Sequence, residues 1–280
     1  MTDTGPPDQD QILYRVEDKV AVITLNRPHK ANAQTLGLLD DLDAAWTRAA
    51  ADEDVRVIVL NANGKHFSSG HDLSGSNGAS GADRGAPQPD KITLQHIYQL
   101  ESRRFLEYTL RWRGVPKPSI AAVQGKCIAG GLLLAWPCDL IIAAENAEFS
   151  DPVVYMGIGG VEYHGHTWEF GARKAKEILF TGRGVTAREA EQVGAVNKVV
   201  PLESLDSETM TLARHISGMD PFGLRQAKRA VNQTLDVQGF YAAIQSVFDI
   251  HQTGHGNALS VSGYPVITNL DQMKENVSRR

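Results

Sequence analysis

Two periodicities of apolar positions define the first elements of the chain. The segments ILYRV (residues 12–16) and VAVITLN (residues 20–26) show the alternation and β-branched content of strands, and only three charged residues separate them. In residues 35–51 the apolar side chains instead recur at every third or fourth position, as on one face of an amphipathic helix. The chain is therefore expected to open with a hairpin that is followed by a helix.

Further along, short apolar strands alternate with helical stretches. The strands are expected within residues 55–64, 118–125, 139–150 and 195–200, and the helices within residues 92–112, 172–180 and 187–193. This alternation predicts an α/β core over residues 1–201. Only helical periodicity follows, in residues 205–216, 223–235 and 239–250, which predicts an all-α C-terminal region over residues 202–280. Residues 74–90 are rich in Gly, Ser and Pro and are expected to form a mobile loop that can act as a lid.

Composition narrows the class of protein. The 280 residues are 42% hydrophobic, enough for a sizeable core, and the net charge of −5 with scattered Lys and Arg argues against a nucleic-acid partner. The longest apolar stretch, residues 128–144, is interrupted by Pro137 and Asp139, and the acidic N-terminus does not resemble a signal peptide. We therefore expect a cytoplasmic protein with no membrane contact, in which Cys127 and Cys138 are reduced core thiols.

Two strands end in glycine turns, within VIVLNANGKHFSSGHDL (residues 57–73) and SIAAVQGKCIAGGLLLAW (residues 119–136). Glycine lets backbone N–H groups turn outward and lets a ligand approach closely. Two such turns on neighbouring strands can direct two N–H donors at one carbonyl oxygen, which is the arrangement of an oxyanion hole. Neither turn has the spacing of a nucleotide phosphate loop.

Four segments in order, LNRPHKANA, HFSSGHDL, AAVQGKCIAGGLLLAWPCDLIIAAENAEFSDP and FTGRGVTAREAEQVGAVNKVVP, resemble the successive signatures of the crotonase (enoyl-CoA hydratase/isomerase) superfamily. The resemblance covers residues 12–202, and the helical tail is also similar. It implies a spiral of strand–strand–helix (ββα) units and an acyl-CoA thioester as substrate, with coenzyme A as part of that substrate and no separate cofactor. It also implies that the helical region covers the site and helps to form a homotrimer or homohexamer.

The resemblance assigns roles to individual positions. The backbone N–H groups of His71, in SSGHD, and of Gly130, in IAGG, correspond to the two oxyanion donors. The implied contacts to coenzyme A and the acyl group fall on His29, Lys30, Ala31, Ser69, Gly70, Asp72, Leu73, Gly131, Leu133, Val153 and His164. For Lys30 and Asp72, plain solvation and a cap on the following turn, respectively, remain open as alternatives.

The sequence departs from the family pattern at the two positions where catalytic glutamates are expected. Hydratases of this family use two glutamates, and the corresponding positions here are Leu133 and Val153, which cannot transfer a proton. The loop GVEYHGHTWEF, residues 160–170, supplies the first-choice replacement, Glu162, and Asp151 is the second. A solvated Glu162 and a turn-forming Asp151 are the structural alternatives. His164 and His166 are further proton-transfer candidates, Tyr163 is expected to pack, and no metal is expected on these residues.

These observations favour an enzyme that stabilises a thioester enolate, as an enoyl-CoA hydratase or isomerase with a non-standard acid/base set. Two alternatives remain open. One is cleavage of the thioester by an acyl-CoA hydrolase, or of a carbon–carbon bond in a retro-Claisen reaction. The other is a CoA-thioester-binding protein without catalytic activity, which Leu133 and Val153 would suit.

Overall fold

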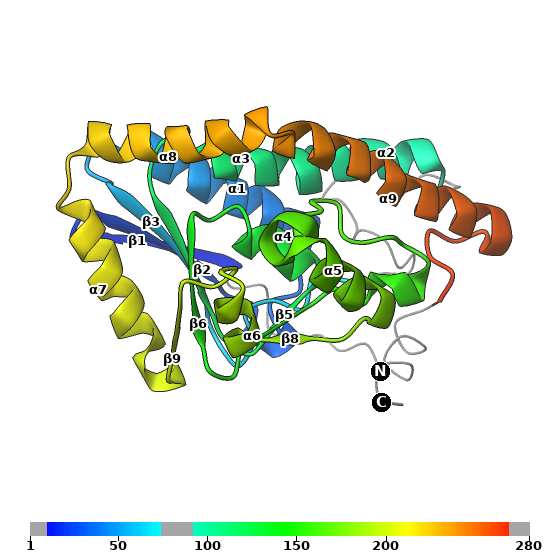
Figure 1. The fold of residues 1–280 in the computed structure, drawn as a ribbon, viewed down its shortest axis with the longest axis horizontal. Helices are drawn as coiled ribbons and strands as arrows, with labels where there is room; N and C mark the ends of the chain where they lie inside the picture. The colour runs from blue at the N-terminus through cyan, green and yellow to red at the C-terminus, as the bar shows by residue number, and fades with distance from the viewer. Residues whose placement is uncertain (1–9, 74–91, 269–280) are drawn as a thin grey trace.

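The computed structural model describes residues 10–73 and 92–268. A six-stranded sheet in the order β1-β2-β3-β4-β6-β9 forms its centre, and β5, β7 and β8 form a second, three-stranded sheet (Figure 1). The strands are β1 (Ile12–Glu17), β2 (Val20–Leu25), β3 (Val57–Ala62), β4 (Ser119–Val123), β5 (Lys126–Ile128), β6 (Leu140–Ala144), β7 (Glu148–Ser150), β8 (Val185–Thr186) and β9 (Lys198–Val200). The loop expected at residues 74–90 lies outside the described residues.

The opening hairpin and helix are confirmed. β1 pairs antiparallel with β2, in a register that places Ile12 opposite Leu25. The helix α1 (Leu36–Ala51) follows, and the Thr35 hydroxyl accepts a hydrogen bond from the Leu38 N–H at 3.0 Å, which satisfies one of the free donors at the helix start. The apolar face of α1 is buried against the sheet, so the helical period read from the sequence is also its packing face.

From β2 onward the large sheet is parallel, as an α/β core requires. The helix expected over residues 92–112 is present, but it contains α2 (Leu94–Glu101), a π-helical segment (Ser102–Glu107) and α3 (Tyr108–Gly114). The sequence period did not reveal the π segment. Since π segments are frequent at functional sites, the side chains of this turn become candidates for the site.

The second sheet is made of short strands that follow strands of the first, since β5 comes after β4 and β7 comes after β6. The polar turn expected after residue 144 leads into β7, which pairs parallel with β5 and antiparallel with β8. Four helical segments accompany these strands: α4 (Leu132–Ala135), α5 (His166–Thr181), α6 (Ala187–Gln192) and the 3₁₀ turn η4 (Val153–Met156). The loop that contains Glu162 runs between η4 and α5, so it passes close to the ends of β5 and β7.

Helices alone follow Val200 within the described part of the chain. α7 (Leu205–Ser217) packs on the large sheet, α8 (Pro221–Val237) follows it, and α9 (Phe240–Ser262) packs against α2 along the upper edge of the molecule in Figure 1. The three expected helices are confirmed, with α9 longer than its period indicated. The α/β class with a helical C-terminal region is therefore confirmed. No helix in residues 10–73 or 92–268 is both long and apolar enough to cross a membrane.

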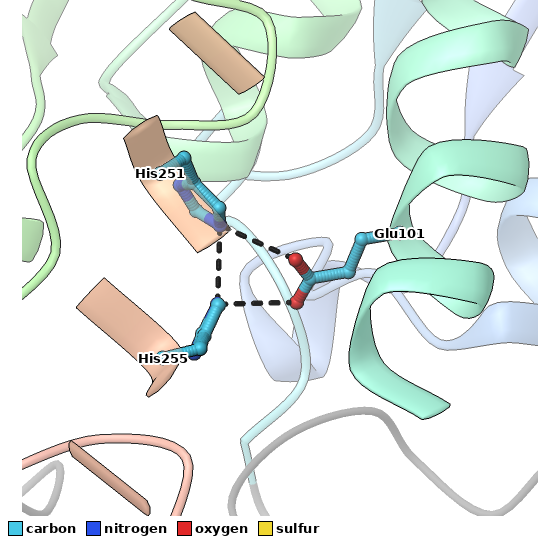
Figure 2. Close-up of side chains that lie close together, drawn as sticks. All are labelled: Glu101, His251 and His255. Atoms are coloured by element: carbon cyan, nitrogen blue, oxygen red, sulfur yellow. Dashed lines mark hydrogen bonds and ion pairs between the residues drawn. The ribbon is translucent and has the colours of Figure 1, made fainter. Parts of the chain in front are cut away.

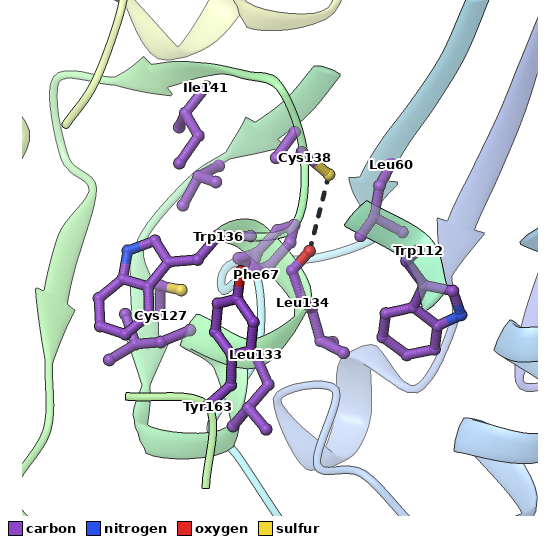
Figure 3. Close-up of a cluster of buried hydrophobic side chains, with 14 of the residues drawn as sticks. Leu60, Phe67, Trp112, Cys127, Leu133, Leu134, Trp136, Cys138, Ile141 and Tyr163 are labelled. Atoms are coloured by element: carbon purple, nitrogen blue, oxygen red, sulfur yellow. Dashed lines mark hydrogen bonds between the residues drawn. The ribbon is translucent and has the colours of Figure 1, made fainter. Parts of the chain in front are cut away.

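The core between the sheets and helices is aromatic and aliphatic. Figure 3 shows part of it, including the labelled side chains Leu60, Phe67, Trp112, Leu133, Trp136 and Tyr163. Cys127 and Cys138 are buried free thiols, as expected, and burial raises the pKa of both. Leu133 is also part of this core, with 2% of its surface exposed.

Candidate active site

The two glycine turns meet at the boundary between the sheets. Ser68 and Cys127 form an isolated parallel bridge, and the Ile128 N–H donates to the Ser68 carbonyl at 3.0 Å. A Cβ atom at Gly131 would lie 2.8 Å from the same carbonyl oxygen, so this approach requires glycine. The juxtaposition expected from the sequence is therefore present in the structure.

His71 and Gly130 face each other across this contact. A Cβ atom at Gly130 would lie 2.9 Å from Cε1 of His71, so the imidazole lies directly against the glycine. Gly70 has φ +88°, which turns the chain just before His71. Gly130 lies in the first turn of the 3₁₀ segment Ala129–Gly131, where backbone N–H groups have no acceptor inside the helix. Its N–H is thus geometrically suited to donate to a ligand oxygen.

The segment expected to bind coenzyme A lies beside the first turn. The Ser69 N–H donates to the Ala31 carbonyl at 2.9 Å, and His29 and Lys30 are exposed in a 3₁₀ turn. Asp72 forms an ion pair with Arg27 at 3.0 Å. Leu73, half-buried, is the last described residue before the gap. The segments 29–31 and 69–73 are therefore joined by a backbone hydrogen bond.

Glu162 lies across from the two turns. Its carboxylate oxygens are 3.3 and 3.4 Å from Nε2 of His71, and the residue is only 4% exposed. The solvated alternative for Glu162 is therefore wrong. The His71 ring also stacks on Phe105, from the π segment, with ring centroids 3.9 Å apart. Phe105 and Glu162 thus hold the imidazole from two sides.

Behind Glu162 lies a buried group that the sequence analysis missed. Nε2 of His251 is 3.8 Å from Glu162 Oε1 and 3.2 Å from Glu101 Oε2. Burial opposes protonation of His251, but its hydrogen bond to Glu101 and the charge of Glu162 outweigh burial and raise its pKa to about 9. A signal was available: His251 and His255 lie four residues apart just beyond the helical stretch predicted over residues 239–250, and on a continued helix they share a face.

Asp151, the second-choice acid, has a different environment. It is fully buried, its two oxygens accept N–H groups of Val161 at 2.9 Å and Val153 at 3.4 Å, and Nε2 of His166 lies 3.0 Å away. Burial alone would raise the pKa of Asp151, but the contacts with His166 and these N–H groups lower it. The carboxylate fixes the turn into the Glu162 loop, in line with its structural alternative.

The other loop side chains are packed. Tyr163 is 1% exposed, as expected of a packing aromatic. His164 and His166 do not lie on a strand; His166 begins α5, and the two ring centroids are 4.5 Å apart. Burial lowers the pKa of His164 to about 4, helped by the charge of His166. His164 is therefore a neutral imidazole near neutral pH.

A cavity of about 540 Å³ lies under α8. Its lining includes Trp136, Tyr163, Glu169, Lys228 and Phe240, but not His71, Gly130 or Glu162. Burial raises the pKa of Glu169 to about 7. Because neither His71 nor Glu162 lines this space, we place the candidate site at the glycine turns, where backbone N–H groups and a carboxyl group lie together.

A parallel sheet whose strand ends bring two glycine turns together opposite a buried carboxylate places the molecule among the crotonase-fold proteins. Residues 15–254 match the family model described as enoyl-CoA hydratase/isomerase, and the chain belongs to this family. The resemblance noted in the sequence is thereby confirmed.

The descriptions of individual relatives agree with this family assignment. A crystal structure of a probable enoyl-CoA hydratase from Mycobacterium thermoresistibile is 72% identical, with a TM-score of 0.86 over 92% of this chain and 100% of that one. A similarly described structure from Mycobacterium smegmatis is 68% identical, with a TM-score of 0.87 over 93% and 100%. A Mycobacterium tuberculosis protein provisionally named enoyl-CoA hydratase EchA13 is 42% identical over 272 residues, 92% of this chain and 85% of that protein.

Proposed function

We propose that the protein acts on an enoyl-CoA as a hydratase or isomerase, with a thioester oxygen held by the N–H groups of His71 and Gly130 and with Glu162 as acid/base. The observation that supports this most is the placement of Glu162 against the His71 imidazole, at 3.3 Å, directly beside Gly130. Leu133 and Val153 occupy the usual acid positions, so a proton-transfer group must come from elsewhere.

The two N–H donors supply the electrostatic part of the reaction. Negative charge develops on the thioester oxygen when the substrate becomes an enolate, and fixed donors stabilise that charge more than they stabilise the neutral carbonyl. In isomerisation, Glu162 removes a proton from one carbon and returns it to another. In hydration, Glu162 takes a proton from water as the oxygen adds to the β-carbon, and then gives that proton to the α-carbon.

The His71 side chain positions the carboxylate. An imidazole that donates its Nε2 hydrogen to Glu162 fixes the direction of that carboxyl group. Nδ1 of His71 is then an acceptor, and it is buried without a protein partner among the described residues. This nitrogen is therefore available to a substrate or water group in the site, which gives His71 both a backbone role and a side-chain role.

The remaining assignments follow from the same substrate. Coenzyme A, as part of the substrate, would run along His29 to Ala31 and Ser69 to Leu73, and the acyl group would pass Gly131, Leu133, Val153 and His164. Assembly as a homotrimer or homohexamer and a cytoplasmic location are proposed with it. The names of the relatives support an enoyl-CoA substrate, and the apolar Leu133 and Val153 favour a bulky hydrophobic acyl group.

The experiment is a turnover assay with a panel of 2-enoyl-CoA and 3-enoyl-CoA thioesters of increasing chain length. Glu162→Gln is expected to lower kcat by about 10²–10⁴-fold because it removes the proton-transfer group but keeps the shape of the side chain. Glu177→Gln, which makes the same change in an exposed ion pair with Lys174 and Arg183, serves as the matched control and should keep full turnover.

The products distinguish the alternatives. A hydroxyacyl-CoA or a shifted double bond supports the proposal, whereas release of free coenzyme A or of a shortened acyl-CoA identifies the hydrolase or retro-Claisen alternative. Tight binding of every thioester without turnover identifies the catalytically silent binding protein. Full activity in Glu162→Gln would rule out Glu162 as the acid/base.

A further inference from the structure

A buried cluster of two histidines and one glutamate lies behind the site, where α9 crosses α2. His251 and His255 project from successive turns of α9 toward Glu101 at the end of α2 (Figure 2). All three are at most 5% exposed. One Nε2 atom from each histidine and a carboxylate oxygen of Glu101 lie within 4.8 Å of one another, so three possible metal-ligand atoms are grouped together.

The spacing of these atoms matches that of metal ligands. The two Nε2 atoms are 3.1 Å apart, and they lie 3.2 and 3.4 Å from the two oxygens of Glu101. In a tetrahedral zinc site with bonds of about 2.0–2.1 Å, neighbouring ligand atoms are separated by about 3.3–3.4 Å. Figure 2 shows the two imidazoles meeting different oxygens of Glu101, and the three separations are close to the ligand-to-ligand distance of such a site.

The outer contacts fix the required tautomers. Nδ1 of His251 lies 2.6 Å from the Gly160 carbonyl oxygen, and Nδ1 of His255 lies 2.7 Å from the Pro265 carbonyl oxygen. A carbonyl only accepts, so each Nδ1 carries the hydrogen, and Nε2 is the nitrogen of each ring that can offer its lone pair to a metal once any proton on it has left. Gln252 donates to Glu101 at 2.7 Å and orients the carboxylate. Such outer hydrogen bonds are the usual support of metal-binding histidines.

The buried acidic groups around the cluster also favour a bound cation. Glu101 and the nearby Glu162 are two buried carboxyl groups, and their oxygens lie 3.2 and 3.8 Å from Nε2 of His251. Within residues 10–73 and 92–268, the only side-chain partners of these two carboxylates are histidines and Gln252. A divalent cation bound here would displace the proton held by the imidazole pair and place positive charge beside both carboxyl groups, as buried charges require.

We propose that Glu101, His251 and His255 bind a divalent metal ion of the zinc class. Two imidazoles and one carboxylate favour zinc over magnesium or calcium, which prefer all-oxygen sites. Three protein ligands leave one position for water. No metal was expected from the sequence, because the sequence alone did not bring Glu101 together with His251 and His255. The ion would tie α2 and α9 to the Gly160 loop and to the segment after α9, through the two carbonyls.

The first experiment uses the full-length wild-type protein without a polyhistidine tag. The protein is stripped with a chelator, dialysed, and loaded with Zn²⁺, and bound metal is measured by mass spectrometry. We expect about one ion per chain and a rise in Tm of at least about 5 °C at saturating Zn²⁺. Loading with Co²⁺ should give the visible absorption bands of a tetrahedral site with nitrogen and oxygen ligands.

Variants locate the ion. His255→Gln and Glu101→Gln should each weaken Zn²⁺ affinity by at least about 100-fold, since even outer-contact substitutions cost 10–100-fold. The double variant His96→Gln/His215→Gln removes two exposed imidazoles and should leave stoichiometry and affinity unchanged. His164→Gln should also keep the metal.

Three results would overturn the proposal. The first is less than stoichiometric Zn²⁺ on the wild-type chain, together with an unchanged Tm; a shared proton would then hold the two nitrogens. The second is unaltered Zn²⁺ affinity in His255→Gln. The third is loss of the metal in His164→Gln with retention in His255→Gln, which would place the ion in the loop. The Zn²⁺ stoichiometry and Tm of the wild-type chain test the proposal even if a buried variant fails to fold.

Discussion

Two buried carboxylates, one before and one after the 3₁₀ turn η4, each face a histidine but have different surroundings. Asp151 faces His166 at 3.0 Å, and two backbone N–H groups donate to it. Glu162 faces His71 at 3.3 Å and His251 at 3.8 Å, and among the described residues no backbone N–H donates to it. Both are inaccessible to bulk water, so burial does not separate a catalytic acid from a structural one.

The difference lies in how fully each carboxylate is hydrogen-bonded. The fixed donors of Asp151 hold its charge and its direction, so the group stabilises the fold but has little capacity for a substrate proton. Glu162 keeps accepting capacity and faces the residue whose N–H is a candidate oxyanion donor. This difference in hydrogen bonding leads to measurable differences in stability and activity.

Substitution of the two acids should separate stability from activity. Asp151→Asn should lower the free energy of unfolding by about 3–5 kcal/mol, because it breaks a buried pair and leaves His166 without its partner. Glu162→Gln should lower it by no more than about 1 kcal/mol, because fewer fixed donors are lost. Urea titration followed by circular dichroism measures both. Equal losses in the two variants would refute the distinction.

The pH dependence of stability should be set in part by His164. Its folded-state pKa, about 4, is below the ordinary value of 6.5, because burial and the charges of His166 and His251 outweigh the opposing charge of Asp151. Between pH 4 and pH 6.5 the unfolded chain binds a proton at His164, and the folded protein does not. Stability should therefore be complete above pH 6.5 and fall by about 2–3 kcal/mol as pH drops toward 4.

His164→Gln provides the control for that dependence. Glutamine does not titrate, so the variant should show a smaller loss of unfolding free energy between pH 6.5 and pH 4 than the wild-type chain. Urea titrations at closely spaced pH values measure the difference. An identical pH profile in the variant would show that the imidazole is accessible to protons in the folded state.

Much of the fold was predictable from local pattern. β1, β2 and α1 were found because apolar period and helix-start chemistry are properties of a few consecutive residues. The π segment and the short strands β7 and β8 were not found. Two or three residues show no period, and their pairing depends on strands far away in sequence.

The site was predictable where a backbone turn carries it. The glycines near His71 and Gly130 are a local signal for two outward-facing N–H groups, because only a few consecutive residues define each turn. The burial of Glu162 was not visible, because GVEYHGHTWEF has the composition of a polar surface loop. Glu101 and His251 are 150 residues apart, and single-chain reasoning offers no way to pair such positions.

The His71 side chain should matter separately from its backbone. His71→Ala keeps the N–H donor but removes the partner of Glu162, so kcat should fall by about 100-fold, or roughly 2.7 kcal/mol. The Kd for an unreactive acyl-CoA, measured by calorimetry, should change by less than about threefold. If Kd and kcat/KM worsened equally with kcat unchanged, the imidazole would serve binding and not proton transfer.

A third carboxylate tests whether hydrogen-bonded acids in this fold are generally structural. Asp139 accepts from the Ser119 N–H at 2.8 Å and from its hydroxyl at 2.9 Å, and Lys228 of α8 lies 2.8 Å away. Asp139 is more exposed than Asp151, so Asp139→Asn should cost only about 1–2 kcal/mol of unfolding free energy and leave turnover unchanged. Ser119→Ala, which removes one of its donors, should cost less still. A turnover loss in Asp139→Asn comparable to that of Glu162→Gln would show that saturation by fixed donors does not identify the structural acids.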